Sequence, residues 1–159
     1  MLDAPALEGF ELFTGLTEQQ LQLLTPFARQ ENVAPGTVFS REGQRAQFLY
    51  LVEQGRVALE LAVSRPDGGH TRPTVLAILG PGQALGWSAL VEPFILTASA
   101  RALDPCRLVA LEAAPLREAL SRYPDVGYLL LSNLSKVLAE RLAQTRQTLI
   151  YERGWAMVG

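Results

Sequence analysis

The stretch "QFLYLVEQGRVALELAVSRPDGGHTRPTVLAILG", residues 47–80, decides the fold prediction. Apolar side chains at positions 57, 59 and 61 alternate with Ala58 and Glu60, which is the two-residue period of a strand with one buried face. Asp67-Gly68-Gly69 then supplies the residue types of a tight hairpin turn. The stretch therefore predicts an antiparallel hairpin.

Glycines recur at fairly even intervals on both sides of this hairpin, and short β-branched or apolar runs lie between them. Short strands with regular turn signals are typical of a sandwich or barrel rather than of alternating strands and helices. The fold class is therefore mainly β: a double-stranded β-helix (jelly roll or β-roll) of about eight antiparallel strands over about 33–111. We expect strands near residues 37–41, 47–53, 56–64, 73–79, 97–103 and 106–111.

Helical patterns flank the strands on both sides. "LTEQQLQLLTPFARQ", residues 16–30, predicts one N-terminal helix, with Thr17 as its cap and Gln20 completing a capping box. Two helices are expected after the strands, a short one over 114–123 and a long one over about 124–153. No linker or repeat divides the 159 residues, so we expect a single domain.

Composition excludes several classes of function. A net charge of −2, spread along the chain, gives no basic patch dense enough to follow a phosphate backbone, so we expect no direct nucleic-acid partner. No window approaches the roughly twenty apolar residues of a membrane span, and the first residues show no basic segment followed by a long apolar run, so we expect an untargeted, soluble protein. The single cysteine, Cys106, allows no internal disulfide, which suits a reducing cytoplasm.

The sequence offers no catalytic constellation. His70 is the only histidine, whereas a jelly-roll metal enzyme needs two or three that converge on one metal. Neither Ser88 nor Cys106 has a base within reach unless His70 folds over it, and no spacing among the glutamates selects an acid/base pair. We therefore expect no enzyme activity, no metal and no cofactor.

One candidate site remains, in "GPGQALGWSALVEPFILTASARA", residues 80–102. A glycine, Gly86, stands just before small residues that can open a helical turn. Backbone N–H groups at such a place are free to bind an anion without any charged side chain. The alternative is that Gly86 only permits a tight turn beneath a packed Trp87.

In order along the chain, these features resemble the cyclic nucleotide-binding domain of the catabolite-activator and protein-kinase regulatory-subunit superfamily. Residues 12–61 look like its opening helix, Pro-Gly strand entry, Arg-Glu-Gly turn and Gly-Arg-Val hairpin. "LAILGPGQALGWSAL" (76–90) and "TASARALDPCRLVALEAAPLREAL" (97–120) resemble the approach to its phosphate-binding cassette and the strands and helix that follow. The resemblance covers about residues 12–142.

The resemblance assigns roles to cassette positions. The family's cassette reads Phe-Gly-Glu, one residue, Ala-Leu, and later Arg, Ser or Thr, Ala; its glutamate binds the ribose and its arginine the cyclic phosphate. Here Trp87 stands at the glutamate position, and Leu96, or Ile95 if the loop shifts by one, stands at the arginine position. The candidate ligand-binding residues of this degenerate cassette are Leu85, Gly86, Trp87, Ser88, Ala89, Leu96, Thr97 and Ala98.

The resemblance implies a non-enzymatic regulatory module. A charge-assisted contact to phosphate contributes roughly 1.5–3 kcal/mol, so without the arginine we expect only weak binding of cyclic AMP or cyclic GMP. Two alternatives are a ligand-independent dimerisation or protein-interaction domain and a binder of a different small apolar or aromatic ligand. Trp87 then fills the pocket or stacks on that ligand. Because the chain ends at Gly159, with no room for a helix-turn-helix, we expect a stand-alone domain.

The long C-terminal helix carries two apolar stripes. Val126, Leu130 and Val137 can face the barrel, which leaves a second stripe for a homodimer seam about a two-fold axis. The alternative is that this second stripe packs on the N-terminal helix of its own chain. Arg141 and Arg146 are expected to weaken the far end of the seam. The seam residues are Leu131, Leu134, Leu138, Leu142 and Leu149, with the tightest contact expected between Leu131 and Leu142.

Overall fold

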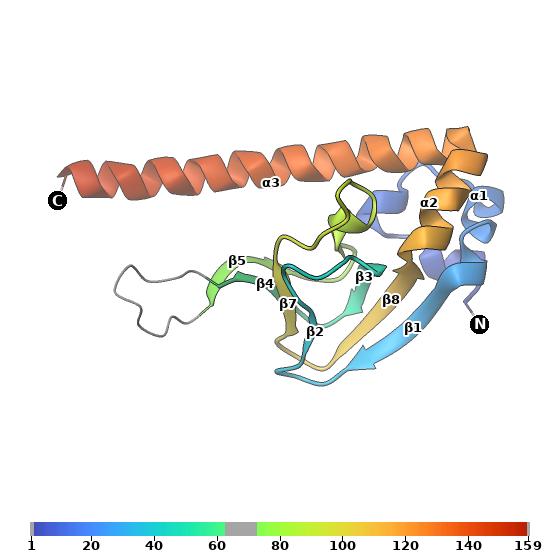
Figure 1. Cartoon of the computed structure of the whole chain (residues 1–159), viewed down its shortest axis with the longest axis horizontal. Helices are drawn as coiled ribbons and strands as arrows, with labels where there is room; N and C mark the ends of the chain where they lie inside the picture. Colours follow the sequence, from blue (N-terminus) through green and yellow to red (C-terminus); the bar gives the residue numbers. More distant parts are fainter. Residues whose placement is uncertain (1, 63–72, 159) are drawn as a thin grey trace.

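Two antiparallel sheets of four strands each form the body of the protein, as expected for a β-roll (Figure 1). The structure is a computed structural model that describes residues 2–62 and 73–158, with side chains up to residue 153. One sheet has the strand order β1-β8-β3-β6 and the other β2-β7-β4-β5. The strands are β1 Ala28–Val33, β2 Val38–Ser40, β3 Phe48–Gln54, β4 Val57–Leu61, β5 Thr74–Leu79, β6 Ala84–Leu85, β7 Ser99–Ala102 and β8 Cys106–Glu112.

All six strands expected from the sequence are confirmed, with small changes at their ends. β4 pairs with β5 in antiparallel fashion, as predicted, with Val57 opposite Leu79 and a register shift between Leu59 and Glu60. The predicted single buried face of β4 is wrong, because Ala58 and Glu60 are buried while Leu59 and Leu61 are only partly buried. The hairpin turn at Asp67-Gly68-Gly69, and His70 beside it, lie outside the described residues.

The expected N-terminal helix is much shorter than its apolar pattern indicates. The capping box is confirmed, because Thr17 Oγ1 accepts the Gln20 N–H at 3.2 Å and Gln20 Oε1 accepts the Thr17 N–H at 2.9 Å. The helix α1 ends at Gln22, since Pro26 cannot continue a helix. From Ala28 the chain pairs with β8 instead. The remaining short helical turns are η1 Ala4–Leu7, η2 Glu11–Phe13, η3 Thr25–Phe27 and η4 Trp87–Ala89.

Strand β3 is buried on both faces, which explains its continuous apolar run "FLYLV". Tyr50 and Val52 point into the core between the two sheets. Leu49 and Leu51 point the other way, into a second core beneath the helices and the N-terminal segment. The sheet that contains β3 is therefore the layer that joins the roll to the helices.

Both expected C-terminal helices are confirmed: α2 spans Ala113–Arg122 and α3 spans Pro124–Val158. α3 runs along one side of the roll and projects beyond the described strands (Figure 1). The Asn133 amide fixes its first turns by donating to Leu12 O at 3.0 Å and Thr14 O at 2.8 Å. Among the described residues, no helix is both long enough and apolar enough to span a membrane.

The structure corrects the expected seam of α3. Leu134 is only 4% exposed and Leu138 also packs against the core beneath the helices. The two side chains therefore pack wholly or partly within their own chain. Leu131, Leu142 and Leu149 stay between 44% and 59% exposed.

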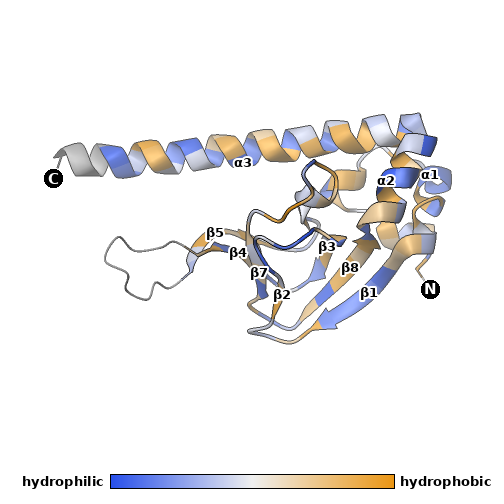
Figure 2. Ribbon diagram, viewed as in Figure 1, coloured by the Kyte–Doolittle hydropathy of each residue, from blue (hydrophilic) through white to orange (hydrophobic). Residues whose placement is uncertain are grey.

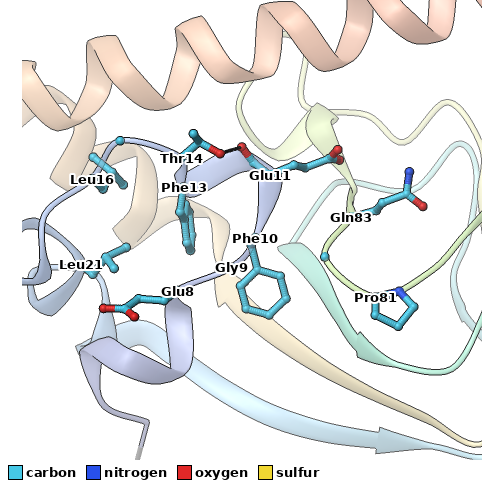
Figure 3. Close-up of a pocket in the computed structure, with 12 residues that line it drawn as sticks. Glu8, Gly9, Phe10, Glu11, Phe13, Thr14, Leu16, Leu21, Pro81 and Gln83 are labelled. Carbon is cyan, nitrogen blue, oxygen red and sulfur yellow. Dashed lines mark hydrogen bonds between the residues drawn. The ribbon is translucent and has the colours of Figure 1, made fainter.

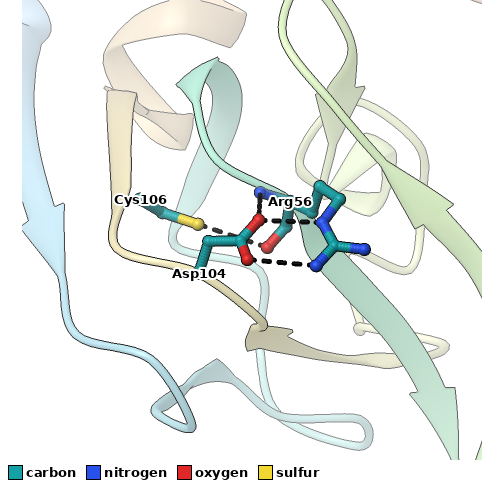
Figure 4. Close-up of polar contacts among 3 residues, drawn as sticks. All are labelled: Arg56, Asp104 and Cys106. Carbon is teal, nitrogen blue, oxygen red and sulfur yellow. Dashed lines mark hydrogen bonds and ion pairs between the residues drawn. The ribbon is translucent and has the colours of Figure 1, made fainter.

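A polar cluster closes the roll where the β3–β4 and β7–β8 turns meet (Figure 4). Asp104 accepts hydrogen bonds from Arg56 Nε at 2.8 Å and Nη2 at 3.1 Å, and Arg56 lowers the pKa of the Asp104 carboxyl. The Cys106 thiol donates to Arg56 O at 3.3 Å and is 3% exposed. Burial raises the pKa of this thiol above its ordinary value.

We predict that Cys106 reacts with a disulfide reagent such as dithionitrobenzoate only when the fold opens. Its raised pKa leaves little thiolate near pH 8, and its burial blocks attack. In stopped-flow labelling, the native protein should react roughly a hundredfold or more slowly than the protein unfolded in guanidinium. Equal rates in the two states would contradict the burial of this side chain.

Candidate functional site

The turn between β6 and η4 depends on glycine. Gly86 lies in the left-handed region, with φ 79° and ψ 34°. A Cβ at this position would lie 2.9 Å from Phe48 O, which is backbone and cannot move aside. The Ala89 N–H then donates to Gly86 O at 2.9 Å and closes the turn η4. The turn therefore needs both the backbone freedom and the missing side chain of glycine.

The site has two parts: the turn between β6 and η4, and the loop that precedes β7. The Leu96 N–H donates to Gln44 O and the Gly43 N–H donates to Leu96 O, both at 2.8 Å. This pairing turns the Leu96 side chain inward, whereas Ile95 is 39% exposed. Of the two candidates for the arginine position, Leu96 is the one that lines the site.

The β6–η4 turn and the loop before β7 enclose a cavity of about 30 Å³, which we call the cassette cavity. Of the eight residues expected at the site, seven line it; Ala89 is fully buried in the core beneath the helices instead. Trp87 and Leu96 also pack against that core, and Ser88 is buried. The lining residues are Ser40, Leu59, Leu85, Gly86, Trp87, Ser88, Leu96, Thr97, Ala98, Ala100 and Arg141.

Four lining residues were not predicted from the sequence, Ser40, Leu59, Ala100 and Arg141, and Arg141 of α3 is the only charged one among them. Its Nη2 donates to Ala84 O at 2.6 Å and lies 3.9 Å from Glu11 Oε1. Burial lowers the pKa of this guanidinium, since the charged form is partly desolvated. The signal was available: Arg141 falls four residues after Val137, on the barrel-facing stripe, so it points toward the roll rather than into a dimer seam.

The N-terminal segment also contacts the backbone around Ala84. Glu11 Oε1 accepts the Ala84 N–H at 3.2 Å, and the Glu11 N–H donates to Gly82 O at 2.9 Å. A hollow of about 490 Å³ lies between this segment and the Pro81–Gln83 turn, and its residues come from both (Figure 3). The approach to the cassette is thus held from both sides, by η2 and by α3.

A second arginine ties the cassette loop to α2. Arg117 Nη1 donates to Ala89 O at 2.8 Å, and its guanidinium lies over the Phe94 ring at 4.1 Å from the centroid. A cation over an aromatic face is attracted by the ring quadrupole. The loop is therefore held to the helices independently of Arg141.

The acidic residues do not gather into a catalytic pair. Buried Glu60 is paired with Arg101 at 2.6 Å, and Glu42 Oε1 accepts the Ala62 N–H at 2.8 Å. Within residues 2–62 and 73–158, no three histidine, cysteine or acidic side chains are placed to hold a metal. The chemistry that the cassette cavity offers is binding, through hydroxyls, backbone groups, apolar walls and one guanidinium.

Comparisons with known proteins agree with this arrangement. Residues 30–123 match the model of the cyclic nucleotide-binding domain family. The chain is 31% identical over 138 residues to the cyclic AMP receptor protein of Thermus thermophilus, covering 87% of this chain and 60% of that protein. A CRP-like cAMP-activated global transcriptional regulator of Mycobacterium tuberculosis is 28% identical over the same share of this chain. The chain spans 60% and 58% of the lengths of these two relatives.

Solved structures show the same fold. The catabolite activator protein of Thermus thermophilus superposes with a TM-score of 0.68 at 29% identity, over 87% of this chain and 61% of that one. A cyclic nucleotide-binding domain from Methylobacillus flagellatus gives a TM-score of 0.79 at 18% identity, over 94% and 85% of the two chains. At that identity, the second likeness concerns the fold alone.

We predict that Gly86→Ala destabilises the protein by roughly 2–5 kcal/mol. About 1–2 kcal/mol comes from the left-handed backbone, and about 1–3 kcal/mol from the clash with Phe48 O. Gly43→Ala is the matched control, because Gly43 has φ 83° but no atom within 4 Å of its added Cβ. Urea unfolding should show the smaller, backbone-only loss for Gly43→Ala; equal losses would contradict the close approach of Phe48.

Proposed function

This chain belongs to the cyclic nucleotide-binding domain family, and we propose that it is a non-enzymatic sensory or regulatory module whose cassette no longer binds cyclic AMP or cyclic GMP tightly. The relatives named above are a receptor and a transcriptional regulator, which supports a regulatory role. A reducing cytoplasm fits the single, buried thiol of Cys106.

The contents of the cassette cavity carry this proposal. Trp87 and Leu96 stand where the family resemblance places the ribose-binding glutamate and the phosphate-binding arginine. Their side chains leave about 30 Å³, which is close to the volume of one water molecule in the liquid. Ligand pockets usually measure about 300–1,000 Å³. The cassette cavity by itself is therefore too small for a cyclic nucleotide, which supports the proposal of weak binding.

Two observations favour the alternative roles. Apolar walls beside Trp87 suit a different apolar or aromatic ligand, which would enter by displacing a side chain. The exposed leucines of α3 suit a ligand-independent dimer. In both alternatives the protein is a regulatory module: in the first it binds a different small ligand, and in the second it acts by dimerisation without a ligand.

We predict that Leu96→Arg raises the affinity for cyclic AMP by about 10- to 100-fold. The new guanidinium would line the cassette cavity and could pair with the phosphate, a contact of roughly 1.5–3 kcal/mol. Calorimetric titration of the purified variant and the wild type measures the change.

Ile95→Arg is the matched control for this gain. It adds the same charge one residue earlier, on a side chain that is 39% exposed and does not line the cavity. Its affinity should stay within about twofold of the wild type, since exposed charges contribute little. An equal gain in both variants would mean that general electrostatics, rather than the cassette position, binds the nucleotide.

A homodimer on α3 is the second part of the proposal. Leu131, Leu142 and Leu149 are the seam leucines that stay exposed, at spacings of eleven and seven residues along one face of α3, and hydrophobic residues recur along the described helix (Figure 2). Tyr128, three residues before Leu131 and 75% exposed, lies next to this face. A leucine contributes roughly 1.5–3 kcal/mol when fully buried, so several must take part to offset an association cost of about 4–15 kcal/mol.

We predict that the wild type is a dimer at micromolar concentration and that Leu142→Glu makes it a monomer. Leu142 is 59% exposed in the single chain, so the change removes seam contacts without disturbing the core. Gln147→Glu places the same charge on the same helix away from the seam and should stay dimeric. Sedimentation velocity measures the oligomeric state of each protein. A monomeric wild type, or a Leu142→Glu variant that stays dimeric, would contradict the proposed dimer on α3.

A further inference from the structure

A groove of about 650 Å³ lies between α3 and the edge strand β5. The β5 side chains Val75, Leu76 and Ile78 line it and are 51%, 55% and 54% exposed. Val137 and Leu149 of α3 also line it. The lining is mixed, with these apolar side chains beside threonines, glutamines and charged residues. A groove of this size is within the range of small-molecule sites, whereas the cassette cavity alone is far below it.

Arg141 lies where the groove and the cassette cavity meet. Of the described residues, it is the only one that lines both spaces. The side chain spans from α3 to Ala84 O, at the entry to the cassette.

The charge of Arg141 is poorly matched by the protein. A guanidinium has five N–H donors, and the only hydrogen bond that it makes here is with a neutral carbonyl. The nearest carboxylate oxygen, Glu11 Oε1, is 3.9 Å away and is already bound to the Ala84 N–H. The side chain is 22% exposed, and no Arg141 nitrogen is buried without a hydrogen-bond partner, so its remaining N–H groups reach the solvent of the two spaces that it lines. A partly desolvated cation with spare donors favours a bound anion.

We propose that the groove and the cassette cavity form one binding site for an amphipathic organic anion, a carboxylate or sulfonate with an apolar body. Arg141 holds the charged head at the cassette end, with the Ser88 and Thr97 hydroxyls close by on the cavity wall. The apolar body lies along β5. This proposal rests on the proposed function, since it names the ligand class and the counter-ion for the same degenerate cassette.

Acidic residues on the groove fix the orientation of such a ligand. Three carboxylates line the groove: Glu140 and Glu152 of α3 are exposed, and Glu11 lies beside Arg141 with its Oε1 bound to the Ala84 N–H. Glu140 and Glu152 repel a negative head at the solvent side, and Arg141 is the only cationic side chain on the described lining. The head therefore points inward and the apolar body outward.

The test uses two fluorescent probes that differ only in a charged group: anilinonaphthalene sulfonate, and the neutral N-phenyl-1-naphthylamine, which lacks the sulfonate. Each is titrated against the full chain. Arg141→Gln should weaken sulfonate binding about tenfold or more while leaving the neutral probe within about twofold. Arg141→Lys keeps the charge and should retain most of the sulfonate affinity. Thermal unfolding of each variant checks that the fold is intact.

Arg146→Gln is the matched control. It removes the same charge from the same helix at an exposed position outside both spaces, so neither affinity should change. The proposal is overturned if folded Arg141→Gln keeps its sulfonate affinity, if Arg146→Gln loses as much, or if neither probe binds the wild type. Cyclic AMP binding by Leu96→Arg judges the proposed function separately, because it does not involve the groove.

Discussion

The site depends on the backbone of Ala84, whose N–H and C=O are both bound by charged side chains. Its N–H is bound by Glu11 from the N-terminal segment, and its C=O is bound by Arg141 from α3. Two residues later the chain makes its left-handed turn at Gly86. One residue of β6 therefore links the cassette to both flanking elements, and a shift of α3 would act on the cassette through a 2.6 Å hydrogen bond. A domain that senses a ligand needs such a link between its pocket and its longest helix.

The shape of the cassette and its ligand chemistry are set by different residues. Gly86 sets the turn because it has no side chain to meet Phe48 O, and Arg117 holds the loop through Ala89 O. Neither contact involves Trp87 or Leu96. The turn and the loop can therefore keep their shape whatever side chains stand at positions 87 and 96, and we propose that Trp87 and Leu96 replace the side chains that would recognise a nucleotide. Because the residues that set the backbone differ from those that would contact a ligand, the chain can be assigned to its family although its ligand is not identified.

Local pattern was sufficient for most of the fold. Alternation predicted β4, and residue types at the helix start predicted the Thr17 capping box, because both are short-range effects. β1 was missed because its polar, exposed residues carry no strand period; its strand state comes from pairing with β8, which is distant in sequence.

The same limit applied to the site. The cassette positions could be named from their order, but whether Leu96 or Ile95 faces the cavity depends on the pairing of Leu96 with Gln44. Arg141 lay on a face that the helical period already marked as inward, yet its partner at Ala84 is a backbone atom that no sequence pattern shows. The most direct test of the account is a calorimetric titration of the wild-type chain with cyclic AMP and cyclic GMP. The account predicts weak binding, with dissociation constants well above about 1 μM, and a submicromolar constant for either nucleotide would contradict it.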